Sequence, residues 1–143
     1  MRPVVIALAA LFSAGAAQAE VSVSNAWVRE TIGAGKTSAG YARIVNTGAA
    51  DRLVSVSTPA AGMADVHQSV EQGGMMRMLP VKVLEIPAKG EMLLKPGGYH
   101  IMIMNAQKPF KVGDVMEFTF TFEHAGKITV PVKVAPITAT AAP

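Results

Sequence analysis

The stretch VMEFTFTFEHAGKITVPVKV, residues 115–134, decides the fold class. Every second residue of its first half is large and apolar: Met116, Phe118, Phe120 and Phe122. Glu and Thr occupy the positions between them. Because successive side chains of a strand point to opposite faces, this alternation predicts a half-buried strand. The turn-forming segment His124-Ala125-Gly126 and a second alternating run follow, which together predict a hairpin.

The same period of two recurs along the chain in short segments separated by Gly, Pro, Asn or Asp. No segment of ten or more residues shows a helical period. The predicted strands cover residues 21–29, 39–46, 52–57, 64–71, 75–79, 92–94, 99–105, 115–122 and 127–134. Nine short strands in one domain predict an all-β fold, either a β-sandwich or a small Greek-key β-barrel.

The first residues differ in character from the rest. Residues 1–19, MRPVVIALAALFSAGAAQA, have an Arg near the start, a short apolar middle and an Ala-x-Ala end, which is typical of a cleaved secretory signal peptide. The apolar run is too short to span a bilayer, and no second long one follows, so we expect no membrane insertion. We therefore expect an exported single domain at residues 20–135, with a flexible tail, PITATAAP, at residues 136–143.

Composition excludes several functions. The formal net charge of the 143-residue chain is only +3, and there is no basic run of the kind that binds nucleic acid. The chain contains no Cys. Disulfide stabilisation, thiolate nucleophiles and CxxC redox chemistry are therefore all excluded, as is a blue-copper electron-transfer centre, which needs a Cys ligand.

The His and Met residues are concentrated in one part of the chain. Seven of them lie between residues 67 and 104: His67, Met75, Met76, Met78, His100, Met102 and Met104. A single Met is more often a core gap-filler than a ligand. A metal-site hypothesis must therefore depend on how these residues are arranged together.

The turn after residue 71 decides whether His67 and Met78 share a face. A two-residue loop at 72–73 places Met78 directly opposite His67, and a loop at 73–74 places it opposite Ser69 and diagonal to His67. In both cases the two side chains share a face. A three-residue loop would put them on opposite faces.

His100 and Met102 share one face of their strand because they are two residues apart, while Ile101 and Ile103 point to the other. Two imidazoles and two thioethers converge if these strand ends meet. Thioether sulfur is a soft ligand that serves Mg²⁺ and Ca²⁺ poorly, whereas Cu(I) accepts thioether and imidazole together. The hypothesis is a site for one Cu(I) ion formed by His67, Met78, His100 and Met102.

The spacing of these four residues resembles the motif of the periplasmic PCuAC copper chaperones: His67, ten residues, Met78, twenty-one residues, His100, one residue, Met102. The similarity extends over residues 25–134. It includes the stretches AWVRE, AGYARIVNTG, ADRLVSVSTPAA, GGMMRM, LEIPAKGEMLLKPGGYHIMIM and FTFTFEHAGKITVPVKV.

The resemblance implies a cupredoxin-like β-barrel that binds one Cu(I) through those four side chains and delivers it in the periplasm. The implied recipient is the copper centre of cytochrome c oxidase, with a Sco-like thiol protein as a further partner. The chain departs from the pattern twice. Ser69 stands where many relatives have Met, and the tail lacks the His and Met residues that some relatives carry there.

Two other function classes stay open at this stage. A copper-dependent redox enzyme would use the same ligands. Asp65 and Glu71 flank His67, but no second carboxylate is placed for acid–base work, so we expect a non-enzyme. An exported structural or adhesion β-sandwich would use its Met residues for packing alone. We expect packing roles for Met63, Met75, Met76 and Met104, an exposed turn position for His124, and core positions for Trp27 and Tyr41, either of which can also shield a metal.

Overall fold

The segment 115–134 folds as its alternation predicts. In the computed structural model, which describes residues 20–33 and 36–143, it forms an antiparallel hairpin closed at the Phe122–Gly126 pair. Phe118, Phe120 and Phe122 are each at most 2% exposed. The predicted signal peptide, residues 1–19, lies outside the described residues, as do residues 34 and 35.

The described residues form ten strands and no helix. The strands are β1 (Val21–Arg29), β2 (Ser38–Asn46), β3 (Asp51–Ser57), β4 (Ala61–Gln72), β5 (Met75–Pro80), β6 (Leu84–Ile86), β7 (Gly90–Leu94), β8 (Tyr99–Ala106), β9 (Val115–Phe122) and β10 (Gly126–Ala135). The all-β prediction is confirmed, and all nine predicted strands are present. The sequence-based prediction missed β6 and placed the start of β4 three residues too late.

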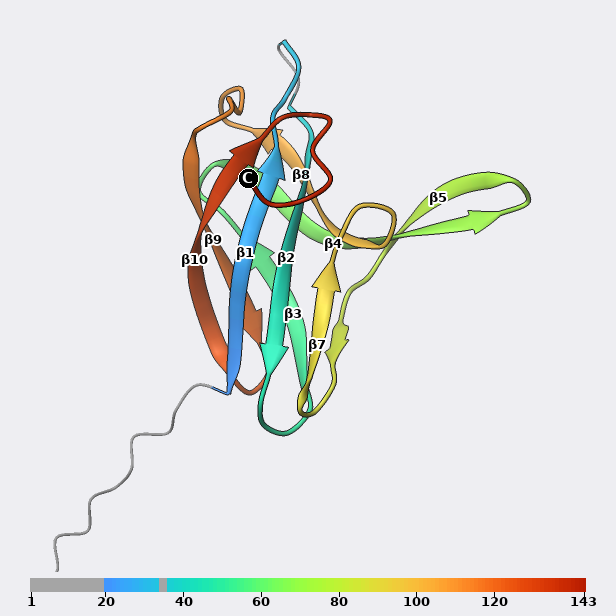
Figure 1. Ribbon diagram of the computed structural model, residues 1–143, viewed down its shortest axis with the longest axis vertical. Coiled ribbons are helices and arrows are strands. Elements are labelled where there is room, and N and C mark those ends of the chain that lie inside the picture. The colour runs from blue at the N-terminus through green and yellow to red at the C-terminus, as the bar shows by residue number, and fades with distance from the viewer. Residues whose placement is uncertain (1–19, 34–35) are drawn as a thin grey trace, which may run out of the picture.

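The strands form one sheet that folds back on itself as two layers. Its order is β5-β4-β8-β2-β1-β10-β9-β3-β6. The remaining strand, β7, pairs with the C-terminal half of β2. All pairs are antiparallel except β1 with β10. Figure 1 shows the two layers facing each other, with β1 and β10 side by side at the front. The first and last strands of the domain are thus neighbours, which ties its two ends together.

The core lies between the two layers. Buried apolar side chains from nearly every strand fill it, and the largest fully buried ones include Phe110, Phe118, Phe120, Ile44 and Ile103. Burying a side chain of this kind stabilises the fold by about 1.5–3 kcal/mol. With no Cys in the chain, this core provides the main stabilisation.

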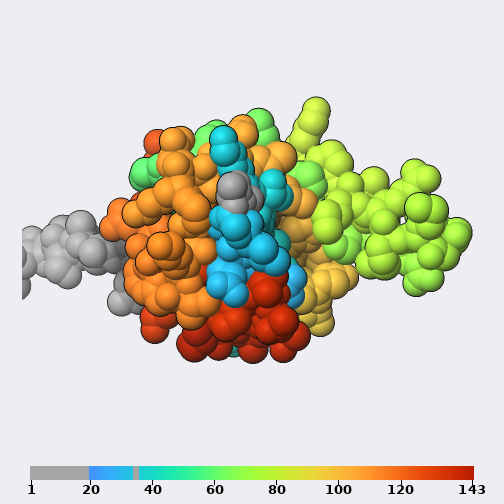
Figure 2. Space-filling model, turned by 90° about the horizontal axis from the view of Figure 1, so that it is seen from above, coloured from blue at the N-terminus to red at the C-terminus, as the bar shows by residue number. Residues whose placement is uncertain are grey.

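Beyond Gln68, where the pairing of β4 with β8 ends, the hairpin of β4 and β5 leaves the body of the molecule as an arm. Figure 1 shows it extending to the right beyond the two layers, and Figure 2 shows the same segment as a separate lobe. Every residue of β5 is exposed, and β5 is an outer edge of the sheet. This arm carries one of the four predicted ligands, Met78.

A second, smaller cluster lies on the outside of the sheet. Trp27 and Tyr41 are buried, and their ring centres are 4.5 Å apart. The tail contributes Ala139 to this cluster, and the Arg29 guanidinium donates hydrogen bonds to the Ala139 carbonyl at 3.0 and 3.3 Å. The tail therefore makes specific contacts with β1 and β2. Its flexibility in solution, like the domain boundaries, stays a prediction.

The part of the chain that the structure describes contains no helix long and apolar enough to cross a membrane.

Candidate metal centre

Two of the predicted ligands face each other across neighbouring strands. β4 and β8 run antiparallel, and His67 pairs directly with His100. Their ring centres are 6.1 Å apart, with the ring planes tilted by 45°. Metal–imidazole bonds are about 2 Å long, so two rings at this separation are within reach of one ion.

The orientation of His100 is fixed by the turn that precedes it. The Nδ1 atom of His100 lies 3.2 Å from the carbonyl oxygen of Gly98. Because a carbonyl only accepts, Nδ1 carries the hydrogen and Nε2 has a free lone pair. The same carbonyl accepts a hydrogen bond from the backbone N–H of Ser69 at 3.1 Å, which attaches the turn to β4. A backbone carbonyl that orients the far nitrogen is a common support of metal-binding His residues.

Two ring nitrogens in this pair are buried without a hydrogen-bond partner among the described residues. They are Nδ1 of His67 and Nε2 of His100. An unpaired buried polar atom costs about 1–3 kcal/mol, and most such atoms in folded proteins are paired. Two of them on facing rings are explained if a cation accepts both lone pairs.

The buried position of His100 favours the neutral form of its ring. The residue is 3% exposed. Burial, as the main cause, lowers the pKa of His100 below the usual 6.5; the hydrogen bond to Gly98 acts in the opposite direction, and the charge of His67 lowers the pKa further. Only a neutral imidazole has a lone pair for a metal, so this environment favours the ligating form.

Met102 lies on the same face as the His pair. It is two residues from His100 in β8, and it pairs with Asp65 of β4 on one side and Ala39 of β2 on the other. Its side chain is half-buried, whereas Ile101 and Ile103 are buried in the core. Ile101 and Ile103 thus face the core, and His100 and Met102 share the opposite face, while their role as ligands stays a prediction.

Met78 occupies the second of the two positions that the sequence left open. Gln72 pairs with Met75, so the loop is Gly73-Gly74, and Met78 lies opposite Ser69, diagonal to His67 on the same face. Both glycines have positive φ, 59° and 80°, as a two-residue hairpin loop requires. The side chain of Met78 is 57% exposed on the arm, so the structure places it next to the His pair in register but leaves it open to solvent.

One neighbour of the His pair, Asp65, is acidic, and the sequence alone assigns it no role. Asp65 is exposed and pairs with Met102, on the face that carries the His residues. Its place on the face of His67 could be predicted, because Asp65 and His67 are two residues apart in one strand. Its pairing with Met102 could not, since β4 and β8 are far apart in the sequence.

The donor set of this face is unusual for a hard metal or zinc. No three His, Cys, Asp or Glu side chains come together anywhere in residues 20–33 and 36–143. The ligands on this face beside the His pair include the thioethers of Met78 and Met102, and this combination of imidazole and thioether favours a soft monovalent ion such as Cu(I). His124, the third His, lies exposed in the turn between β9 and β10, as expected.

Comparisons with known proteins agree with this fold. The apo PCuAC domain from PmoF1 superimposes with a TM-score of 0.69 at 27% identity, covering 82% of this chain and 94% of that one. The solution structure of Cu(I)-DR1885 from Deinococcus radiodurans gives 0.64 at 27% identity, covering 87% and 84%. The fold expected from the resemblance, that of the cupredoxin-like PCuAC domains, is confirmed.

Sequence comparison assigns the family. A protein of Leifsonia xyli subsp. xyli, Lxx21020, whose name describes a lipoprotein, is 34% identical over 117 residues, 79% of this chain and 69% of that protein. The LpqE-like family model matches residues 21–134, the whole span from β1 to Val134 of β10. The chain belongs to the LpqE-like family.

Proposed function

We propose that this protein is a copper(I) metallochaperone that holds one ion through His67, Met78, His100 and Met102 and passes it to a protein acceptor. The observation that carries the proposal is the pair of unpartnered, buried imidazole nitrogens on facing strands. The likeness to DR1885, whose structure was determined with Cu(I), and to a PCuAC domain supports copper as the ion.

The two His side chains are placed to hold the ion. The His67 and His100 nitrogens are shielded from water, and the Gly98 carbonyl fixes the His100 ring before any ion arrives. Little reorganisation is then needed on binding. All four ligands are neutral, so the ion keeps its charge and no thiolate is exposed to oxidation.

Release would begin at Met78. Its thioether is the most accessible of the four ligands and lies on an arm that stands away from the body. A ligand from an acceptor protein can approach the ion from this side and replace the Met78 sulfur first. The two imidazoles would then be exchanged one at a time, and copper would stay Cu(I) throughout.

We place this activity in the periplasm, after export directed by residues 1–19. The recipient that the resemblance implies is the copper subunit of cytochrome c oxidase, with a Sco-like thiol protein as a further partner. The naming of a relative as a lipoprotein agrees with export. We propose that the protein transfers its ion and catalyses no reaction, because both imidazoles of the centre are assigned to the metal and the neighbouring carboxylate, Asp65, is exposed to solvent.

A competition titration tests the site. Cu(I) is titrated under anaerobic conditions against a chelator of known affinity, for the wild type and for each ligand changed to Ala. We expect one tight equivalent, and losses of about 10-fold or more in each variant. Met75→Ala is the matched control, because Met75 is equally exposed on the other face of β5. Unchanged affinity in all four ligand variants would refute the site.

A transfer assay tests the recipient. The Cu(I)-loaded protein is mixed with the purified copper domain of a cytochrome c oxidase, with and without a Sco-like thiol protein, and the copper content of each is measured after separation. We expect copper to move to the oxidase domain. If the chaperone keeps its ion under all conditions while the chelator removes it, another protein is the recipient.

A further inference from the structure

The outer face of the β4–β8 ladder carries a second set of soft ligands next to the His pair. Met63 of β4 pairs directly with Met104 of β8, two residues beyond the pair of Asp65 and Met102. We propose that Met63, Met102 and Met104 form a second, thioether-only Cu(I) site, from which the ion enters the His67–His100 site. The entry role rests on the proposed function.

The register places these three residues close enough together for their sulfurs to reach one ion. Side chains directly opposite on antiparallel strands have Cβ atoms about 4.5–5.5 Å apart, and residues two apart on one strand are about 7 Å apart. A Met side chain has three rotatable bonds, so three sulfurs starting from these positions can all reach one ion. The backbone beneath them is held by Ile103 and Ala64, which are buried in the core.

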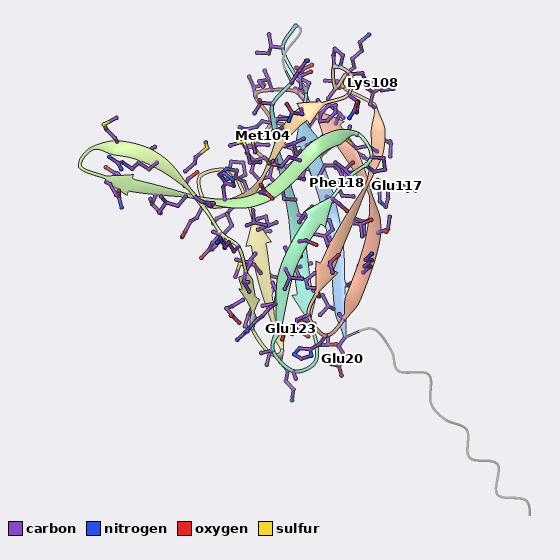
Figure 3. All side chains as sticks on the ribbon, turned by 180° about the vertical axis from the view of Figure 1, so that it is seen from behind. Glu20, Met104, Lys108, Glu117, Phe118 and Glu123 are labelled. Carbon is purple, nitrogen blue, oxygen red and sulfur yellow. The ribbon has the colours of Figure 1, made fainter. Side chains whose placement is uncertain are left out.

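Packing does not explain these methionines. Met92 and Met116 pack against the core, as a gap-filling Met is expected to do. Met63 is 46% exposed, and Met102 and Met104 are only half-buried on the face away from the core. Figure 3 labels Met104 on this part of the sheet, near the root of the arm. The exposed thioethers lie where an incoming ion can reach them.

The charge of the face also favours a cation. Asp65 is exposed, pairs with Met102, and lies between the Met63 position and the His67 position of β4. A carboxylate here attracts a monovalent cation to a surface whose other ligands are neutral. It stands between the two sites and so lowers the electrostatic cost of moving an ion from one to the other.

Met102 belongs to both sites, which allows transfer by ligand exchange. The copper–sulfur bonds to Met63 and Met104 break while copper–nitrogen bonds to His67 and His100 form, and the bond to Met102 is kept. Copper stays Cu(I), and no electron is transferred. Imidazole nitrogens replace thioethers, so we expect the ion to rest at the His pair and to occupy the thioether site only transiently or in excess copper.

The experiment is a Cu(I) titration of the full chain to two equivalents, followed by NMR of ¹³C-labelled Met methyl groups. We expect the Met102 signal to shift over the first equivalent and the Met63 and Met104 signals over the second. In M63L/M104L, a volume-conserving change, the second equivalent should be lost and the first kept within about twofold. M75L, an exposed Met on the arm, should keep both.

Entry is tested by stopped-flow loading from a Cu(I)–chelator complex, which should be slower in M63L/M104L than in M75L. Equal rates would overturn the entry role. The second site is overturned if the wild type takes up no second equivalent, or if M63L/M104L takes it up unchanged. The outcome is separable from the proposed function: if Met63 and Met104 shift while H67A/H100A binds as tightly as wild type, the thioether site stands and the His site is wrong.

Discussion

His100 is buried, yet only one of its two ring nitrogens has a hydrogen-bond partner. The Gly98 carbonyl beneath it also accepts from Ser69, so it would stay satisfied without the imidazole. The imidazole therefore stabilises the fold less than an apolar side chain would in the same buried position. This is the combination expected of a residue kept for binding.

Replacing His100 by Leu should therefore separate stability from binding. We expect the free energy of unfolding of the metal-free protein to stay the same or rise by about 1 kcal/mol, because an unpaired buried nitrogen is removed. Cu(I) affinity should fall by about 100-fold. Urea denaturation and chelator competition measure the two quantities. A variant that loses stability but binds copper as before would show that His100 is structural.

The same residue makes the stability of the metal-free protein depend on pH. Burial, chiefly, lowers the pKa of His100 below 6.5, so the unfolded chain takes up a proton at a pH where the folded chain does not. The contribution of His100 is highest above pH 6.5 and declines as the pH falls toward the lowered pKa. Denaturation at pH 7.5, 6.5 and 5.5 should show this decline in wild type and a smaller one in H100L. Equal declines would contradict it.

At the scale of elements, the register of the arm decides which thioether reaches the His pair. Met76, Met78 and Pro80 share the face of His67, and Leu79 points to the other face. In a background of M78L, which should weaken Cu(I) binding, adding P80M puts a thioether directly opposite His67. Adding L79M puts one on the wrong face.

We expect P80M to recover part of the lost affinity and L79M to recover none, as measured by chelator competition. Equal recovery by both would mean that the arm does not keep its register when copper binds. Equal failure of both, with the fold intact by circular dichroism, would mean that only position 78 can supply the ligand.

The sequence predicted the positions of the strands better than it predicted which strands pair with each other. Alternation alone located β1 and β9 to the residue, because long runs of period two are a local signal. It missed β6, which has only three residues. It also missed the first three residues of β4, because the small residues that follow Pro59 are typical of a loop. These segments are strands because of their partners in space.

The same limit applies to the candidate metal centre, where the sequence predicts which residues share a face but not which strands are neighbours. The shared faces of His67 with Met78, and of His100 with Met102, follow from period two and one hairpin loop. The direct pairing of His67 with His100 joins two strands, β4 and β8, that have three other strands between them in the chain, so it could not be predicted from the length of a hairpin loop. The projection of the arm away from the body is equally a matter of tertiary packing.

At the scale of the whole molecule, one buried carboxylate connects two segments that are far apart in the sequence. Asp51 of β3 is 3% exposed, and its carboxylate accepts hydrogen bonds from the backbone N–H groups of Arg52, His124 and Ala125 at 2.7, 3.0 and 2.9 Å. Burial alone would raise the pKa of Asp51, but these hydrogen bonds and the charge of His124 hold it below its usual 3.8.

Asp51 should therefore stabilise the fold above pH 4, and that stabilisation should be lost as the pH falls through its lowered pKa. We expect Asp51→Asn to lose about 1–3 kcal/mol of unfolding free energy at pH 7 and to depend less on pH below 4. Asp65→Asn in the metal-free protein is the control, an exposed change expected to stay within about 0.5 kcal/mol. Similar losses in both variants would mean that the turn is held by other contacts.

X-ray absorption of the protein loaded with one equivalent of Cu(I) examines the ion and its ligands together. We expect a Cu(I) edge and two shells of neighbours, nitrogen from the two His rings and sulfur from the Met thioethers, with the sulfur shell weakened in M78A/M102A and the nitrogen shell in H67A/H100A. Failure to retain one equivalent, or a spectrum with light-atom neighbours alone, would contradict a His–Met copper site in this protein.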